Sequence, residues 1–169
     1  MNRRACVVGL TALGVWWGGL AIAEAATAER FYMSSATGFC QSALPVFDGN
    51  IRKRPTAVAN EGTSNAFVSC SMPTAGDSST GITTIVLFFH NRGSTAVTFS
   101  CSLVHSFQAG SLIVPKAIDI LGHDTNGQAW FRADVGNPAS MSFANFSCNL
   151  PASVEISYGY YPYSYEVGA

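Results

Sequence analysis

The stretch ITTIVLFFHNRGSTAVTFSCSLVHS, residues Ile82–Ser106, decides the fold. Its first part, Ile85–Phe89, is apolar at every position, which is typical of a strand buried on both faces. Its second part alternates, because successive side chains of a strand point to opposite faces. The apolar face of that second part is Val97, Phe99, Cys101 and Leu103, and Val104 alone breaks the pattern. Since Asn91-Arg92-Gly93 lies between the two parts, the stretch predicts a hairpin against which the remaining chain packs.

Further strand patterns flank this stretch at spacings of roughly ten to twelve residues. They are Thr56–Ala59, Asn65–Met72, Ser111–Leu121, Gln128–Val135, Ser140–Leu150 and Val154–Tyr161. No helix is predicted after the N-terminal segment. About eight strands without helices predict an all-β fold, a two-sheet antiparallel sandwich of jelly-roll type.

Two of these strands carry local signals. Pro115 lies inside Ser111–Leu121, and because proline cannot donate to a strand ladder, this strand is expected at a sheet edge or with a bulge. Asn126-Gly127 predicts a tight hairpin turn before Gln128–Val135. In the latter strand, the alternation assigns one face to the core and the other to solvent. The expected core face is Ala129, Phe131, Ala133 and Val135, and the expected outward face is Trp130, Arg132 and Asp134.

The N-terminal segment has the features of a secretory signal peptide. Arg3 and Arg4 precede an uncharged apolar run, Cys6–Ala23, and several small-x-small cleavage patterns follow within residues 23–28. The alternative is a membrane anchor, since the run is close to the length that spans a bilayer. The stacked cleavage patterns favour removal. The sequence therefore predicts a signal peptide over residues 1–28, one domain over residues 29–169, and a secreted or periplasmic protein that leaves the membrane after cleavage.

Four cysteines remain after that segment: Cys40, Cys70, Cys101 and Cys148. An even number in an exported chain predicts two disulfides. Three of the four lie on apparent core faces of strands. We favour the pairs Cys40–Cys70 and Cys101–Cys148, with Cys40–Cys148 and Cys70–Cys101 as the alternative. No C-x-x-C spacing points to a metal site instead.

The charge pattern gives no nucleic-acid footprint. Residues 29–169 contain nine acidic and seven basic side chains, a net charge of −2. The one basic cluster, Arg52-Lys53-Arg54, is expected in a solvated loop. Nucleic acid is therefore not an expected partner.

The spacing of several motifs resembles that of a known group of proteins. The motifs are Cys40-Gln41, FVSC at Phe67–Cys70, FSCSL at Phe99–Leu103, FSCNLP at Phe146–Pro151, and a tyrosine-rich final strand ending near Glu166. Together they resemble short exported bacterial proteins that are mostly uncharacterised β-sandwiches. The motifs are cysteines and strand ends, so the resemblance implies a fold and no activity.

No pattern of catalytic residues is complete. His90, His105 and His123 offer bases, but no G-x-S-x-G elbow is present, and Gly76–Ser79 lacks the surroundings of an esterase nucleophile. The carboxylates Asp119, Asp124 and Asp134 are expected to be solvated, with Asp124 serving a turn. His123–Asn126 offers ligands for a loop-bound Ca²⁺ as an alternative. We therefore expect no enzyme, no cofactor and no metal.

Aromatic side chains are the best candidates for function. Tyrosines crowd the C-terminal strand, and exposed rings stack on sugars and anchor protein partners. The candidate ligand-binding residues are Trp130, Arg132, Tyr161, Tyr163 and Tyr165, while Val154, Ile156, Tyr158 and Tyr160 are expected to face the core. The sequence thus predicts a non-catalytic exported protein that binds a glycan or a cell-surface protein. The alternatives are a cell-surface assembly subunit whose N-terminal segment donates a strand, and a small hydrolase using His105 or His123.

Overall fold

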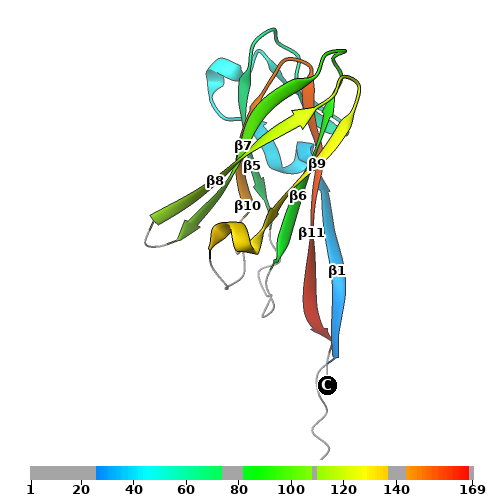
Figure 1. Cartoon of the computed structure of the whole chain (residues 1–169), viewed down its shortest axis with the longest axis vertical. Helices are drawn as coiled ribbons and strands as arrows, with labels where there is room; N and C mark the ends of the chain where they lie inside the picture. Colours follow the sequence, from blue (N-terminus) through cyan, green and yellow to red (C-terminus); the bar gives the residue numbers. More distant parts are fainter. Residues whose placement is uncertain (1–25, 74–81, 108–109, 137–143, 168–169) are drawn as a thin grey trace, which may run out of the picture.

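The computed structural model describes residues 26–73, 82–107, 110–136 and 144–167, and it consists of two antiparallel sheets packed face to face (Figure 1). Sheet A has the strand order β3-β4-β11-β6-β9, and β1 also pairs with β11. Sheet B has the order β2-β5-β10-β7-β8. In sheet A the strands are β1 Ala26–Ser35, β3 Ile51–Arg54, β4 Ala57–Asn60, β6 Thr84–Asn91, β9 Thr125–Phe131 and β11 Val154–Val167.

Sheet B consists of β2 Cys40–Ser42, β5 Ala66–Met72, β7 Val97–Phe107, β8 Gly110–Ile120 and β10 Ala144–Leu150. The helical elements are short: α1 Ala36–Phe39 and two 3₁₀ turns, η1 Pro45–Phe47 and η2 Arg132–Val135. From β4 onward the chain crosses repeatedly between the sheets, as in a jelly roll. The predicted all-β, two-sheet antiparallel sandwich is confirmed. The described residues form eleven strands rather than about eight, because β1, β2 and β3 lie outside the predicted strand ranges.

The predicted central hairpin is wrong, although both of its strands exist. β6 belongs to sheet A between β11 and β9, and β7 belongs to sheet B between β10 and β8. The connection over residues 92–96 therefore crosses the sandwich. The buried side chain of Asn91 fixes this crossing, since its Nδ2 donates to the carbonyls of Thr95 and Leu121 at 2.8 and 3.2 Å. An apolar strand followed by a turn and an alternating strand is equally compatible with pairing within one sheet and with crossing between two.

The predicted Asn126-Gly127 turn is also wrong. Both residues lie inside β9, where they pair with Phe89 and Phe88 of β6. The turn falls earlier, over residues 121–124, and His123 takes the positive φ of 58° that it needs. This connection also crosses between the sheets, from β8 to β9, so no two-residue hairpin forms there.

Other local predictions agree with the structure. The strand that contains Pro115, β8, lies at the edge of sheet B. The inward faces predicted for Asn65–Met72 and Ser140–Leu150 are buried wherever the structure describes their side chains. The basic cluster Arg52-Lys53-Arg54 lies in strand β3 rather than in a loop, but its side chains are exposed as expected.

Both predicted disulfides are confirmed, and both lie in sheet B. Cys40 and Cys70 face each other across β2 and β5, and Cys101 and Cys148 face each other across β7 and β10. All four cysteines are buried. Direct opposition on neighbouring strands brings each pair of Cα atoms to 3.9 Å, so the alternative pairing is excluded.

The core fills the space between the sheets and is closed along the edge where β8 meets β9. The indole N–H of Trp130 on β9 donates to the carbonyl of Val114 on β8 at 3.2 Å. The Lys116 ammonium of β8 donates to the Ala129 carbonyl of β9 at 2.9 Å. These two bonds join edge strands of different sheets, which share no strand ladder. The sandwich is therefore closed along this edge, and the inner face of sheet A, which lines the core, is separate from its outer face.

Candidate binding face

The structure does not bring the predicted ligand-binding residues together. Trp130 was expected to face outward, and this is wrong: it is fully buried, opposite Ile85 of β6. Its neighbour Phe131 is 50% exposed, so the two faces of this strand are the reverse of those predicted. A buried indole fills a large core volume, and Val114 satisfies its N–H. Arg132 lies in η2, because the strand ends at Phe131 instead of continuing to Val135.

The faces of the last strand are also reversed beyond residue 156. The pairing of β11 with β6 shifts between Ile156 and Tyr158, so Ser157 is an extra residue, a β-bulge. Ile156 points inward as predicted, but the bulge turns Tyr158 and Tyr160 outward and Tyr161 inward. Tyr161 is fully buried, and its hydroxyl donates to the Pro73 carbonyl at 2.9 Å. The prediction that Tyr161 is a surface residue is therefore wrong.

The two remaining predicted tyrosines lie along the same strand. Tyr163 is partly buried, and its ring centroid lies 6.0 Å from that of Tyr161. The side chain of Tyr165 lies outside the described residues, although its backbone pairs with Ala28. The ring of Tyr161 stacks against Tyr32 of β1 at 5.1 Å. This tyrosine group therefore belongs largely to the inner side of sheet A.

A different set of side chains forms a continuous apolar surface on the outer side of sheet A. We call it the aromatic face and define it by Phe31 and Met33 of β1, Tyr158 and Tyr160 of β11, and Phe88 of β6. Ring centroids are 6.4 Å apart for Phe31–Tyr160, 6.0 Å for Tyr160–Phe88 and 4.4 Å for Phe88–Tyr158. Phe31 and Met33 are 69% and 66% exposed. The face therefore crosses three adjacent strands without a break.

Two rings of the aromatic face, those of Phe88 and Tyr158, are packed on each other and over a glycine of the next strand. The ring of Phe88 leans over Gly127 of β9, where an added Cβ would lie 2.8 Å from Cε1 of the ring. Tyr158 then stacks on Phe88 with an interplanar angle of 15°. Glycine at position 127 is thus required by the close approach of a ring, and the absent side chain leaves that space for Phe88. The arrangement holds two rings nearly parallel in fixed positions.

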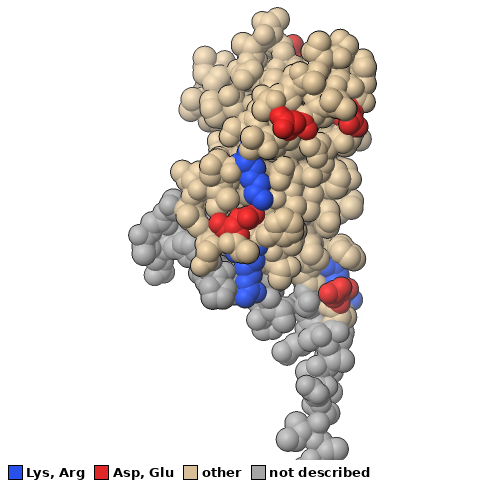
Figure 2. Space-filling view, in the orientation of Figure 1, with Lys and Arg blue, Asp and Glu red and all other residues tan. Residues whose placement is uncertain are grey.

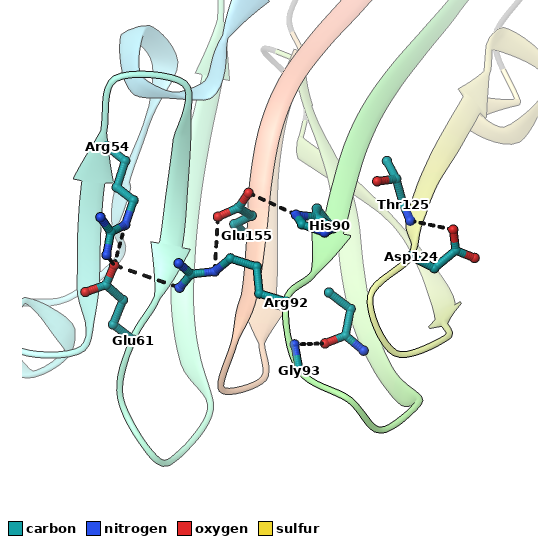
Figure 3. Close-up of polar contacts among 9 residues, drawn as sticks. Arg54, Glu61, His90, Arg92, Gly93, Asp124, Thr125 and Glu155 are labelled. Carbon is teal, nitrogen blue, oxygen red and sulfur yellow. Dashed lines mark hydrogen bonds and ion pairs between the residues drawn. The ribbon is translucent and has the colours of Figure 1, made fainter.

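A row of paired charges adjoins the aromatic face (Figure 3). We call it the ion ladder and define it by Arg54, Glu61, Arg92, Glu155 and His90. Arg54 Nε donates to Glu61 at 2.6 Å, and Arg92 lies 3.8 Å from Glu61 and 3.3 Å from Glu155. His90 Nδ1 lies 3.2 Å from the other oxygen of Glu155. His90 follows Phe88 by two residues on β6, so the ladder begins where the rings end.

Two similar Asn-x-Gly turns present the middle of the ladder. Asn60-Glu61-Gly62 follows β4, Asn91-Arg92-Gly93 follows β6, and both asparagines are buried. Each asparagine Oδ1 accepts from the glycine N–H two residues later, at 3.0 and 2.9 Å. Each Nδ2 donates to two backbone carbonyls. Because β4 and β6 lie on either side of β11, the two turns place Arg92 within reach of both Glu61 and Glu155.

The outer face of sheet B has a different composition. Its residues include Ser69, Ser71, Ser100, Ser102, Asn145 and Ser147, interleaved with the buried cysteines. A groove of about 480 Å³ lies on this side, and Gln41, Lys53, Ser69, Ser71 and Asn145 contribute to its walls. Lys53 Nζ donates to the Thr37 carbonyl at 3.4 Å beside it. The groove is also lined by Phe39, Val104 and Phe146, so its walls combine polar and apolar side chains with one cation.

Other candidate chemistry is not assembled among the described residues. The described contacts of histidines are His90 with Glu155 and the His123 N–H with the Gly93 carbonyl, and neither includes a serine hydroxyl. The side chain of His105 and the segment Gly76–Ser79 lie outside the description. Within the described ranges, no three His, Cys, Asp or Glu residues lie close enough to hold a metal ion. Asp124 serves its turn, since its Oδ1 accepts from the Thr125 N–H at 2.8 Å.

The remaining acidic candidates make local contacts. Asp119 accepts from the Thr98 hydroxyl at 2.6 Å. Asp134 lies 2.7 Å from Lys116 and accepts from the Phe131 N–H at 2.8 Å. These two contacts, chiefly the one with Lys116, hold the pKa of Asp134 below its ordinary value of 3.8. The carboxylates are therefore separate structural contacts, and they do not face one another across a cleft.

Charged side chains are sparse over much of the surface. Figure 2 shows that the viewed side is mostly uncharged, with acidic and basic side chains together in a few small groups. Of the helices in the described part of the chain, none has the length and apolar character needed to cross a bilayer. The face seen in Figure 2 therefore carries no extended patch of one charge that would steer a charged polymer.

Comparisons with known proteins leave the function open. No protein-family model and no curated protein match the chain. Among solved structures, it is similar to TmCBM61 in complex with β-1,4-galactotriose, with a TM-score of 0.39, 11% identity, and coverage of 81% of this chain and 88% of that one. It is also similar to a solved structure described as "CBM4 structure and function", with a TM-score of 0.35, 10% identity, and coverage of 78% of this chain and 81% of that one. Likeness at this level supports no functional conclusion, and the resemblance to exported bacterial proteins stays a prediction.

Sequence reasoning missed most of the aromatic face and all of the ion ladder. Phe31 and Met33 lie outside the predicted strands, and Phe88 lies in a strand that is predicted to be buried on both faces. Two signals were present in the sequence. The Asn-x-Gly pattern occurs twice, at residues 60–62 and 91–93, with opposite charges at its middle position. Gly127, inside a strand, marks a close approach by a neighbouring group.

Proposed function

We propose that the protein is a non-catalytic, exported glycan-binding protein, and that the aromatic face with the adjoining ion ladder is its binding surface. The observation that supports this most directly is the unbroken row of partly exposed rings across β1, β11 and β6. Soluble proteins seldom expose a contiguous apolar surface without a use for it.

The chemistry of a sugar matches both parts of the surface. A pyranose ring has apolar C–H faces, which pack against aromatic rings, and hydroxyl groups around its edge, which donate and accept hydrogen bonds. Tyr158 and Phe88 provide rings whose positions are fixed by stacking. Arg92 and Glu155 provide charged donors and acceptors that strengthen such bonds.

The charge of the ladder indicates a neutral glycan. Arg54 and Arg92 alternate with Glu61 and Glu155, so these four charges cancel. An acidic polysaccharide would need an excess of cations, which these four residues of the ladder do not offer. The partners we propose are therefore uncharged polysaccharides at a cell surface or outside the cell. Two disulfides suit an oxidising compartment of that kind.

The test is glycan binding by matched variants. The wild-type chain is screened against an array of neutral and acidic glycans, and hits are measured by isothermal titration calorimetry. For the best neutral ligand we expect Tyr158→Ala to weaken binding about 10- to 100-fold, because an anchoring ring is lost. Glu155→Gln is expected to weaken it about 3- to 10-fold through loss of a charged acceptor.

Phe67→Ala is the matched control. Phe67 is a 42% exposed ring on β5 of sheet B, so its removal takes the same kind of side chain from the opposite side. The affinity of the Phe67→Ala variant for the same neutral glycan should stay within about twofold of wild type. The proposal is contradicted if no glycan binds, or if Phe67→Ala loses as much affinity as Tyr158→Ala. Binding confined to acidic glycans would contradict the neutral-ligand part alone.

A further inference from the structure

Strand β1 leaves one long edge of sheet A open. It pairs with β11 along its whole length, from Ala26 opposite Val167 to Ser35 opposite Tyr158. Its principal contacts within the described chain are with β11 and the short helix α1 that follows it. Figure 1 shows β1 at the margin of the molecule. Every second residue of β1 therefore turns its backbone N–H and C=O away from β11, toward solvent.

The other sheet edges carry features that prevent pairing with a further strand. β8 has Pro115 near its centre, β2 is three residues long, and β3 has three consecutive exposed cations. β9 is followed at once by η2, and its Ala129 carbonyl already accepts from Lys116. Natural proteins block edges in these ways to avoid unwanted association. β1 is ten residues long, of which seven lie in the domain predicted to begin at residue 29; it contains no proline, and its register shows no bulge.

The far end of β1 belongs to a two-stranded ribbon. The pairing of β11 with β6 ends at Tyr160 opposite Val86, so beyond that point the described part of β11 pairs with β1 alone. Figure 1 shows this pair of strands extending away from the body of the sandwich. Two strands without a third are only marginally stable in water. A further strand on the open edge of β1 would stabilise the ribbon.

We propose that β1 pairs with β1 of a second copy of the chain, antiparallel about a two-fold axis, so that sheet A continues from one copy into the other. This addition of a strand to an open edge supplies backbone hydrogen bonds without any new element. A two-fold axis uses the same surface on both copies and closes the assembly at a dimer.

The side chains select the register. A two-fold axis perpendicular to the sheet keeps the outer faces of the two copies on the same side. One residue of β1 then lies opposite the same residue of the other copy, and the axis passes between these two residues. The two central choices in Ala26–Ser35 are Arg30 and Phe31. An axis at Arg30 places two arginines directly opposite each other, which is unfavourable. An axis at Phe31 places two rings opposite each other, Arg30 opposite Tyr32, and Met33 opposite Glu29.

This register covers exposed apolar surface. Phe31 and Met33 are 69% and 66% exposed in one copy and lie on the outer side of the shared edge. The dimer brings the aromatic faces of both copies onto one continuous sheet. The dimer needs no glycan to form, since its contacts are between backbones and between the two Phe31 rings.

The first test is the mass of the protein in solution without any glycan. Sedimentation equilibrium of the mature chain, as released by a secreting host, should show a monomer–dimer equilibrium. Phe31→Lys should raise the dimer dissociation constant about tenfold or more, because like charges then oppose each other across the axis. Phe31 is largely exposed, so the change does not disturb the core.

Ile113→Lys is the matched control. Ile113 is 59% exposed on the proline-containing edge strand β8, so the same kind of substitution is made at the other long edge. Its dissociation constant should equal that of wild type. A strict monomer up to millimolar concentration, or equal effects of the two variants, overturns the proposal.

The second test examines the register through cross-linking. Phe31→Cys should form an intermolecular disulfide spontaneously, because the two positions face each other directly. Met33→Cys is the control, since its two copies would lie about 14 Å apart along the strands and should not link. Linking of Met33→Cys in place of Phe31→Cys would overturn this register.

Discussion

The outer face of sheet A carries stacked rings and paired ions, whereas the outer face of sheet B carries mainly serine and asparagine side chains. On sheet A, Tyr158 stacks on Phe88 with centroids 4.4 Å apart. On sheet B, the residues between the buried cysteines include Ser100 and Ser147. Water solvates the hydroxyl groups of sheet B well, but it solvates exposed rings poorly. Sheet A is therefore the side on which a ligand gains most from contact.

The two sheets also differ in what joins their strands. Both disulfides lie in sheet B, and each joins directly opposed residues on adjacent strands. Sheet A has no disulfide among its described residues, and rings and ion pairs make its cross-strand contacts. Cross-strand aromatic and ionic pairs each contribute modestly, whereas a disulfide constrains the unfolded chain. Sheet B is thus covalently joined, and sheet A depends on side chains that the proposed glycan would also contact.

Trp130→Ala should have the largest effect, because Trp130 lies between the two sheets. Its indole is fully buried, and its N–H donates to Val114 of sheet B. We expect the free energy of unfolding to fall by about 3–5 kcal/mol through loss of packing and an unpaired carbonyl. Denaturant unfolding measures this. Phe131→Ala, at the next and half-exposed position, is the control, and an equal loss in both would contradict the core role of Trp130.

Replacing Cys101 and Cys148 by alanine should destabilise the protein nearly as much. The bridge spans 47 residues, and the chain-entropy model gives a loss of about 4 kcal/mol. The Cys40–Cys70 bridge spans 30 residues, so its removal should cost slightly less. At a temperature where the variants stay folded, ligand affinity on sheet A should be unchanged. A parallel loss of affinity would show that the two outer faces are not independent.

Gly127→Ala should have a smaller effect, confined to sheet A. The new methyl group would lie 2.8 Å from the Phe88 ring, so the ring must move and its stacking with Tyr158 weakens. We expect a loss of about 0.5–1.5 kcal/mol in the free energy of unfolding, with weaker glycan binding. Gly49→Ala adds the same group where nothing lies within 4 Å and is the control. Unchanged affinity in Gly127→Ala would argue against the ring pair as a binding surface.

Asp134→Asn should have the smallest effect, and it should depend on pH. The folded pKa of Asp134 is lowered by Lys116 and by the Phe131 N–H. Its contribution to stability is therefore fully present above the unfolded pKa, near 4, and is lost as the pH falls through the lower folded value. The side chain is 28% exposed, so at neutral pH we expect a loss below about 1 kcal/mol.

Thermal unfolding across this pH range checks the Asp134 prediction. The wild-type and Asp134→Asn curves should differ at neutral pH and converge below the folded pKa of Asp134. Asp119→Asn is the control, since the described contact of the Asp119 carboxylate is with the Thr98 hydroxyl, which carries no charge. A difference that persists at low pH would show that the effect of Asp134→Asn is not caused by its charge.

The sequence by itself determined most of the strands and the two-sheet class, and it favoured the observed disulfide pairs over one alternative. Alternation identified the inward faces around Cys70, Cys101 and Cys148, because a half-buried strand has a period of two residues. It also placed Pro115 on an edge strand, since proline lacks the backbone donor. These features are local, and neighbouring residues are enough to specify them.

Only the tertiary structure decided which sheet each strand joins and which side of a strand faces outward. β6 and β7 follow each other in sequence but lie in different sheets, and nothing in their turn distinguishes crossing from pairing. One extra residue, Ser157, reversed the faces of Tyr158, Tyr160 and Tyr161, because a bulge shifts the period of two by one. The aromatic face brings together β1, β6 and β11, which are distant in the chain, so it exists only through pairing between strands.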